Sequence, residues 1–168
     1  MKHAKPLSIV LLCLSLFLVS SCDTTIYLVR HAEKEVGVVN PHLTESGRRR
    51  AITLCDTLIS KRINYILSTD SNRTRETAQP TSLRVAIPVN SYGKDTAMLL
   101  VEGLKKLWGK NILLVTHSET IPLIMQAFGL TLQTPIGNSF NRFIVIKRHR
   151  GVNGSPSTTS HNESTYGE

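Results

Sequence analysis

Short apolar runs alternate along the chain with longer stretches in which apolar residues recur every three or four positions. The short runs are typical of strands, and NILLVT at 111–116 is the clearest of them. They predict strands at 25–30, 65–68, 83–89, 111–116 and 140–147. Strands that alternate with helices indicate a parallel sheet whose connections cross its two faces. We therefore predict an α/β fold, a three-layer α/β/α sandwich with a mostly parallel, doubly wound sheet.

The stretches between the strands predict four helices. Thr44 is the expected N-cap of the first, in which Leu54 and Leu58 lie on one face. The second should end before Pro80, because proline cannot donate the backbone hydrogen bond that a helix interior needs. The predicted helices open at 44 and cover 72–78, 96–107 and 118–128.

The two ends of the chain differ from its middle. Lys2 and Lys5 precede an apolar run at 7–19, which is typical of an export signal and is too short to cross a bilayer as a helix. The run ends in Val-Ser-Ser-Cys, which resembles the bacterial lipobox, so Cys22 is the expected lipidation site; an ordinary cleaved signal is the alternative. Residues 151–168 are polar and predict a disordered tail.

These features divide the chain into a signal peptide at 1–21, one folded domain at 22–150 and the tail at 151–168. A lipid anchor at Cys22 would place the domain in the cell envelope, on the extracytoplasmic side of a bacterial membrane. Because Cys55 is the one cysteine beyond this anchor, no internal disulfide is expected. We expect a monomer.

The formal net charge of +8 suits an anionic partner. The basic residues stand in short separate groups, and aromatic residues for base stacking are few, so we expect no nucleic acid. An anionic membrane surface or a phosphorylated substrate, either a small molecule or a phosphoprotein, explains the charge equally well. No grouping of cysteine and histidine has zinc-site spacing, and we expect neither a metal nor a cofactor.

Cationic and imidazole side chains follow three of the predicted strands. Arg30 and His31 come at the end of the first strand, His117 follows NILLVT, and Arg73 begins the helix after the second. Ligands of open α/β sheets bind at the carboxyl ends of the strands, and a helix N-terminus favours an anion. Guanidinium groups match phosphate oxygens two at a time. These residues therefore predict a phosphate pocket.

The stretches LVRHAEK, LTESGRRRA, STDSNRTRETA and LLVTHSETIP resemble, in order and spacing, the motifs of the histidine phosphatase superfamily, also called phosphoglycerate-mutase-like. The resemblance implies a metal-independent phosphoric monoester hydrolase. His31 would be the nucleophile that forms a phosphohistidine. Arg30, Arg73 and His117 would hold the phosphoryl group, with His117 also counted as catalytic.

The general acid that protonates the leaving oxygen is the least defined part of the predicted site. Asp95 is the candidate by its position between the second arginine motif and His117, followed by Glu33 and Glu102. Each has a structural alternative: Asp95 as a helix cap, Glu33 and Glu102 as solvated charges.

The stretch between Ala78 and His117 is too short to hold a lid over the site in addition to a strand and a helix. An open site favours hydrolysis over intramolecular transfer, because water can reach the phosphoenzyme. We therefore predict a phosphatase of phosphomonoesters. A protein phosphohistidine phosphatase is the first alternative, since an imidazole leaves without a strong acid. A non-catalytic anion-binding module of the envelope is the second.

Overall fold

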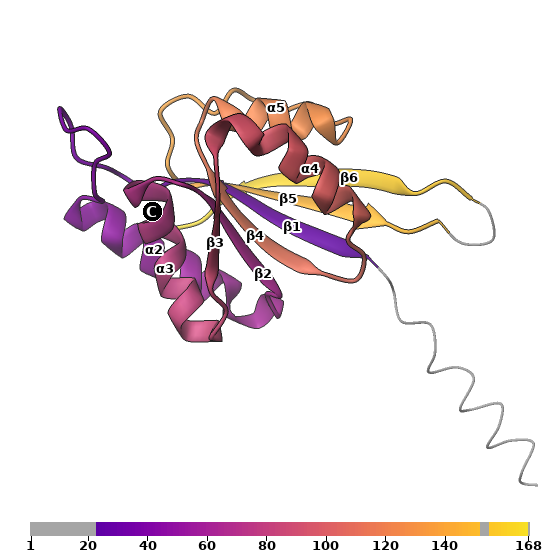
Figure 1. Cartoon of the computed structure of the whole chain (residues 1–168), viewed down its shortest axis with the longest axis horizontal. Coiled ribbons are helices and arrows are strands. Elements are labelled where there is room, and N and C mark those ends of the chain that lie inside the picture. Colours follow the sequence, from indigo (N-terminus) through magenta and orange to yellow (C-terminus); the bar gives the residue numbers. More distant parts are fainter. Residues whose placement is uncertain (1–22, 152–154, 168) are drawn as a thin grey trace, which may run out of the picture.

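The computed structural model describes residues 23–151 and 155–167. In this part of the chain one six-stranded sheet has the strand order β3-β2-β4-β1-β5-β6 (Figure 1). Strands β1 to β4 run parallel, whereas β5 pairs antiparallel with β1, and β6 with β5. The strands are β1 (Thr24–Arg30), β2 (Tyr65–Thr69), β3 (Val89–Tyr92), β4 (Asn111–Thr116), β5 (Arg142–His149) and β6 (Thr158–Thr165).

Two pairs of helices cover the sheet, one pair on each face, and this confirms the predicted three-layer architecture. They are α2 (Glu45–Leu58) and α3 (Asn72–Val85) on one face, and α4 (Ala97–Lys106) and α5 (Thr120–Ala127) on the other (Figure 1). Alternate residues of β1 enter the two cores: Ile26 and Leu28 pack with α4 and α5, and Tyr27 and Val29 with α2 and α3. Short turns η2 (Ile59–Lys61) and η3 (Lys94–Thr96) complete the connections.

Helix α2 begins where the sequence predicts it. The Thr44 hydroxyl accepts a hydrogen bond from the Gly47 N–H at 3.1 Å, which satisfies one of the donors that a helix start leaves unpaired. Leu54 and Leu58 are fully buried beneath the sheet. Gly47 lies against the backbone of Glu33, where a β-carbon would come within 2.1 Å of the carbonyl oxygen. The chain that follows β1 therefore rests directly on α2.

The predicted ends of the second helix and the third strand, around Pro80, are wrong. Helix α3 continues through this proline to Val85, and the next strand starts at Val89 and not at Leu83. Thr77, Ala78 and Thr81 are buried on the inner side of α3, so packing outweighs the local cost of a proline in the helix. The helix instead ends at Ala86, whose positive φ of 54° breaks it.

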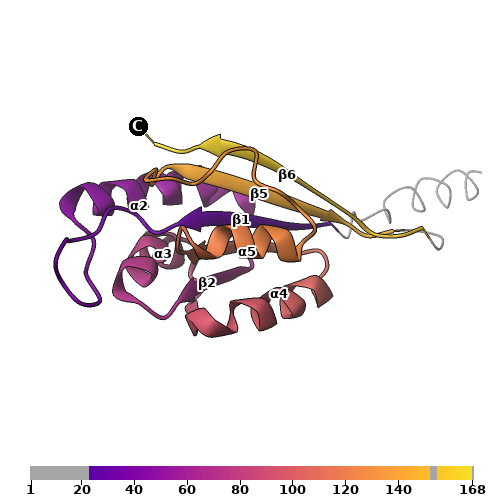
Figure 2. The same cartoon turned by 90° about the horizontal axis from the view of Figure 1, so that it is seen from above.

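The polar C-terminal tail also differs from the prediction, because residues 158–165 form β6 along the outer side of β5 (Figure 2). The strand then places the Tyr166 ring in the core at 4 % exposure, 6.0 Å from the ring of Phe143. A buried ion pair joins Glu163 to Arg142 of β5. Backbone pairing and one aromatic anchor hold a segment whose composition alone indicates disorder.

The predicted signal peptide and Cys22 lie outside the described residues. Within the described ranges, no helix is long and apolar enough to cross a bilayer. Cys55 is a free thiol, buried on α2.

A pair of glycine substitutions tests the packing of α2 beneath the β1 end. Gly47→Ala drives a methyl group into the Glu33 carbonyl, so we expect the free energy of unfolding to fall by about 1–3 kcal/mol. Gly103→Ala, in open space on α4, should raise it by about 0.5–1 kcal/mol. Urea denaturation measures both, and equal effects would contradict the close approach.

Replacing the C-terminal aromatic tests whether the tail is part of the core. Tyr166→Ala should lower the free energy of unfolding by about 3 kcal/mol, because a fully packed ring is removed. Ser160→Ala, at an exposed position of the same strand, is the matched control and should change it little. A disordered tail would give two equally small effects in thermal melts.

Candidate active site

The register of two parallel strands brings the two predicted histidines together. Arg30 of β1 pairs with Thr116 of β4, so His31 and His117 each follow their strand at the same level. The His31 N–H donates to the Thr116 carbonyl at 2.9 Å, and the two ring centroids lie 5.5 Å apart. Both side chains are buried, at 4 % exposure each. The imidazoles therefore share one small space at the carboxyl edge of the sheet.

Arg73 reaches the same space from the first turn of α3. Its Nη2 lies 3.4 Å from Nδ1 of His117. The helix begins at the turn after β2, where Thr74 donates its hydroxyl to the Thr69 carbonyl at 2.7 Å. This turn points the helix N-terminus, with its partial positive charge, toward the pair of histidines. The predicted meeting of Arg73 with His117 is present.

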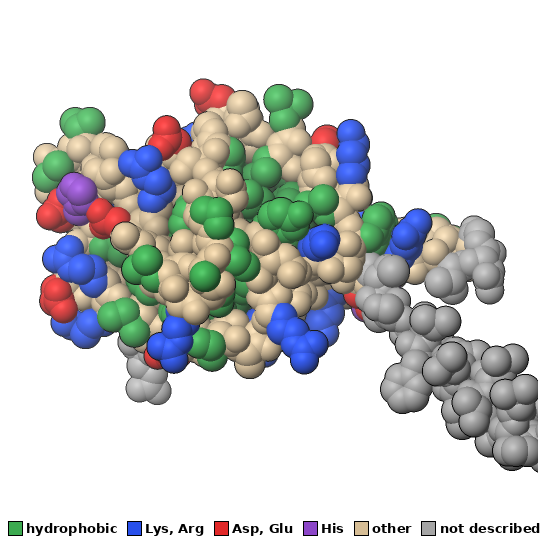
Figure 3. Space-filling model, turned by 60° about the horizontal axis from the view of Figure 1, so that its bottom comes forward, with side chains coloured by type: hydrophobic (Ala, Val, Ile, Leu, Met, Phe, Trp, Pro, Cys, Tyr) green, Lys and Arg blue, Asp and Glu red, His purple; other side chains and the backbone are tan. Residues whose placement is uncertain are grey.

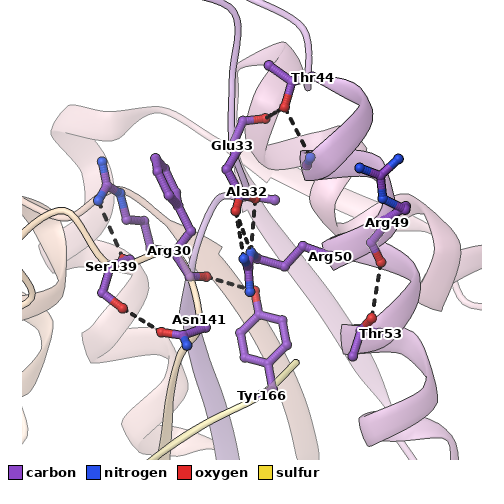
Figure 4. A network of polar contacts seen from close by, with 12 residues as sticks. Arg30, Ala32, Glu33, Thr44, Arg49, Arg50, Thr53, Ser139, Asn141 and Tyr166 are labelled. Atoms are coloured by element: carbon purple, nitrogen blue, oxygen red, sulfur yellow. Dashed lines mark hydrogen bonds and ion pairs between the residues drawn. The ribbon is translucent and has the colours of Figure 1, made fainter. Parts of the chain in front are cut away.

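Arg30 is held at the site by the loop before β5. Its guanidinium lies 4.1 Å from the centre of the Phe140 ring and donates to the Gly137 carbonyl at 3.2 Å. Figure 4 shows the second donation, to Ser139. The Phe140 ring also lies 5.8 Å from the ring of His31, so one aromatic contacts both groups. Stacking fixes the guanidinium plane without using all of its N–H donors.

The two arginines keep buried donors without partners. Nε of Arg30 and Nε of Arg73 are both buried and hydrogen bond to no atom of the described residues. An unpaired buried N–H is costly, and an oxyanion between the arginines would satisfy it. The electrostatics and the donor geometry of the site therefore suit phosphate.

His31 presents one nitrogen to this space. Its Nδ1 lies 2.7 Å from the Ala32 carbonyl oxygen, which can only accept, so Nδ1 carries the proton and Nε2 keeps a lone pair. The Ala32 N–H is fixed in turn by the Thr77 hydroxyl at 2.9 Å. Burial, with the nearby charges of Arg30 and Arg73, lowers the pKa of His31 to about 4. The ring is thus neutral near pH 7.

A chain of hydroxyl groups sets the orientation of His117. The Thr74 hydroxyl donates to a carbonyl and accepts a hydrogen bond from the Thr69 hydroxyl at 3.1 Å. The Thr69 oxygen, 2.9 Å from Nε2 of His117, is thus left to accept a hydrogen bond from Nε2–H. Nδ1 is left as the acceptor that faces Arg73. Burial and the Arg73 charge lower the pKa of His117 to about 4. An anion beside Arg73 would favour a second proton on this ring.

The carboxylates near the site are bound to cations. Glu33 accepts from Nε of Arg50 at 2.8 and 2.9 Å, an arrangement visible in Figure 4 beside the ring of Tyr166. Glu119 accepts from Nζ of Lys94 at 2.7 Å. Burial opposes ionisation of both groups, but the partner cations outweigh it: the pKa of Glu33 is lowered, and that of Glu119 falls to about 2. Both are ionised near neutral pH.

The predicted acid candidates take different places. Asp95 is exposed in η3 and makes no hydrogen bond or ion pair with the described residues, whereas its neighbour Lys94 turns to Glu119. Glu102 pairs with Lys105 on the surface of α4, and Glu33 is bound to Arg50. Neither Glu33 nor Glu102 is thus free to serve as an acid. Among the described residues no group of histidine, cysteine, aspartate and glutamate could hold a metal ion.

Sequence reasoning missed several residues that shape the site. Thr69 and Thr77 orient His117 and the backbone after His31, and their places in the STDSNRTRETA motif could have indicated them. Phe140 comes from the loop before β5 and Lys94 from η3, and the composition of these segments gives no such signal.

Comparison with known proteins agrees with this geometry. The family profile of the histidine phosphatase superfamily (branch 1) matches residues 26–93, which include Arg30, His31 and Arg73. No curated protein matches the whole sequence significantly.

Solved structures share the fold at low sequence identity. A mycobacterial glucosyl-3-phosphoglycerate phosphatase superposes with a TM-score of 0.61 at 17 % identity, over 76 % of this chain and 91 % of its own. A protein histidine phosphatase, SixA, in complex with tungstate has a TM-score of 0.59 at 12 % identity, over 84 % and 96 %. A phosphoserine phosphatase of Entamoeba histolytica has a TM-score of 0.59 at 15 % identity, over 86 % and 98 %. Residues 26–93 are thus similar in sequence to the histidine phosphatase superfamily (branch 1), and the described chain shares the fold of these solved phosphatase structures.

Proposed function

We propose that this protein is a phosphatase that hydrolyses phosphomonoesters through a phosphohistidine on His31. The observation that carries the proposal is the state of this ring: Nδ1–H is held by the Ala32 carbonyl, which leaves the lone pair on Nε2, and the ring lies beside that of His117, which Arg73 contacts. A neutral, oriented imidazole beside fixed cations is an activated nucleophile for phosphorus.

The reaction would proceed in two transfers at phosphorus. In the first, Nε2 of His31 forms a bond to phosphorus while the bond to the leaving oxygen breaks, and that oxygen takes up a proton from solvent water. In the second, water attacks the phosphohistidine, the P–N bond breaks and the ring regains its lone pair as inorganic phosphate leaves. Arg30 and Arg73 stabilise the charge on the phosphoryl oxygens in both transfers.

His117 would respond to the bound phosphate. Its Nδ1 faces Arg73 as a lone pair in the free protein, so a phosphate oxygen there is accommodated when the ring takes up a proton. The Thr69 hydroxyl keeps Nε2 as a donor in either state. Phosphate binding is therefore coupled to protonation of His117.

One observation favours the second candidate, hydrolysis of phosphohistidine in proteins. Glu33 and Glu119 are held ionised by Arg50 and Lys94, and Asp95 is exposed, so strong acid assistance to an alkoxide is not built into the free site. An imidazole needs little assistance when it leaves. Comparing kcat/KM for a phosphoramidate with that for an aryl phosphate distinguishes the two candidate functions. A higher value for the phosphoramidate supports hydrolysis of phosphohistidine.

For location, we propose that Cys22 carries a lipid and anchors the domain to the extracytoplasmic side of a bacterial membrane. The support is the apolar run that ends in Val-Ser-Ser-Cys directly before β1. Metabolic labelling with a palmitate analogue, lost in Cys22→Ala, tests the anchor independently of the phosphatase activity.

Loss of the nucleophile should abolish turnover. We expect His31→Ala to lower kcat for p-nitrophenyl phosphate by at least about 10³-fold, because no other group forms the covalent intermediate. His149→Ala removes an exposed histidine at the opposite end of the sheet and should leave kcat unchanged. Tight phosphate binding without turnover in the unsubstituted chain would instead assign the pocket to an anion-binding module.

His31 and His117 should titrate at a lower pH than ordinary histidines. Proton NMR titration of the free protein should give midpoints near pH 4 for His31 and His117, compared with about 6.5 for an ordinary histidine. Because the unfolded chain binds these protons first, stability should fall as the pH drops from about 6.5 to about 4. Added phosphate should raise the His117 midpoint. Midpoints at or above 6.5 without phosphate would contradict the buried, cation-lined site.

A further inference from the structure

The edge of the sheet opposite the candidate active site carries a concentration of cations. It is formed by the turn before β2, the loop between α4 and β4 and the end of β5. We name this surface the basic edge and define it by Lys61, Arg62, Lys105, Lys106, Trp108, Lys110, Lys147, Arg148 and Arg150. Figure 3 shows several blue Lys and Arg side chains toward the right-hand end of the domain in that view. Asp23 and Glu102 lie beside the basic edge, and they form ion pairs with His149 and Lys105 respectively.

Most cations of the basic edge have no carboxylate partner among the described residues, whereas several cations near the active site do. Arg50, Arg75 and Lys94, near the active site, each form an ion pair with a carboxylate. On the basic edge, within the described residues, Lys105 alone is paired with a carboxylate, that of Glu102. The positive charge of the basic edge is therefore largely uncompensated within the described residues.

The single tryptophan of the sequence is fixed in the middle of this surface. Buried Arg148 donates to the carbonyls of Leu104, at 3.1 Å, and Lys105, at 2.8 Å, and so caps the C-terminus of α4. Its guanidinium lies 4.4 Å from the centre of the Trp108 ring, and that of Arg150 lies 5.9 Å away. Trp108 is half-buried, with an apolar ring held among cations.

The N-terminal end of the described chain lies at the same edge. Strand β1 begins at Thr24, beside Arg148 in the pairing of β1 with β5. Cys22, the proposed anchor, precedes Thr24 by two positions in the sequence. The active site lies at the other end of β1, whose seven residues extend about 23 Å.

We propose that the basic edge lies on an anionic lipid bilayer, with Trp108 at the level of the headgroups and the active site facing away from the membrane. Lysine and arginine at such a surface are attracted by anionic headgroups, and tryptophan favours the boundary between water and hydrocarbon. A polyanionic nucleic acid fits less well, because one half-buried aromatic offers no stacking platform for successive bases. The proposal does not depend on the phosphatase chemistry. Its consequence for the active site is access to soluble phosphorylated substrates.

Because Trp108 is the one tryptophan, its fluorescence reports on this surface alone. The full chain is reconstituted into phosphatidylcholine vesicles with and without phosphatidylglycerol, each prepared with brominated acyl chains that quench a nearby indole. We expect quenching in the anionic vesicles, little quenching in the zwitterionic ones, and loss of the difference at about 1 M salt, where charges are screened within about 3 Å.

Two triple substitutions test whether the quenching of Trp108 depends on the basic edge or on the total positive charge of the protein. K110Q/K147Q/R150Q removes three cations of the basic edge, and K34Q/R48Q/R49Q removes the same number from the other end of the molecule. The first set should lose the quenching and the second should keep it, with circular dichroism melts confirming that each set folds. The wild-type comparison of lipids and salt does not depend on either variant.

The proposal is overturned by equal quenching in the two kinds of vesicle, or by quenching that the first set retains. It is also overturned if a DNA duplex shifts the Trp108 emission and anionic vesicles do not, a result that would assign the basic edge to nucleic acid.

Discussion

The parallel pairing of β1 with β4 is the constraint on which the candidate site depends. Because Arg30 is level with Thr116, the next residue of each strand is a histidine, and the two rings meet without any loop having to fold over them. The hydrogen bond from the His31 N–H to the Thr116 carbonyl continues the ladder of the sheet into the site. A shift of one residue in this register would turn one imidazole to the opposite face. The fully buried core of the sheet on both faces makes such a shift costly.

Charge is arranged around this pair so that each group keeps one ionisation state. Burial and two guanidiniums keep the imidazoles neutral, whereas Arg50 and Lys94 keep Glu33 and Glu119 ionised. The unpartnered Nε atoms of Arg30 and Arg73 leave the site short of negative charge. A phosphate dianion supplies that charge, which is why the same arrangement that is costly when empty favours the bound anion.

The sequence was most informative where local pattern and burial agree. The strand NILLVT, the Thr44 cap and the strand-end positions of His31 and His117 follow from apolar periodicity and from known sites in α/β sheets. Prediction failed where distant parts of the chain decide the outcome. Packing carries α3 through Pro80, and pairing with β5 orders a polar tail that ends in buried Tyr166. Phe140 reaches the site from a loop and Lys94 from η3, and their roles depend on contacts that no local pattern encodes.

A crystal structure with orthovanadate, which mimics the phosphoryl group in transfer, tests the central claim most directly. The account predicts vanadium bonded to Nε2 of His31, with its oxygens hydrogen bonded by Arg30, Arg73 and His117. Vanadate bound at another surface, or in contact with His31 through Nδ1, would contradict the shared phosphate site.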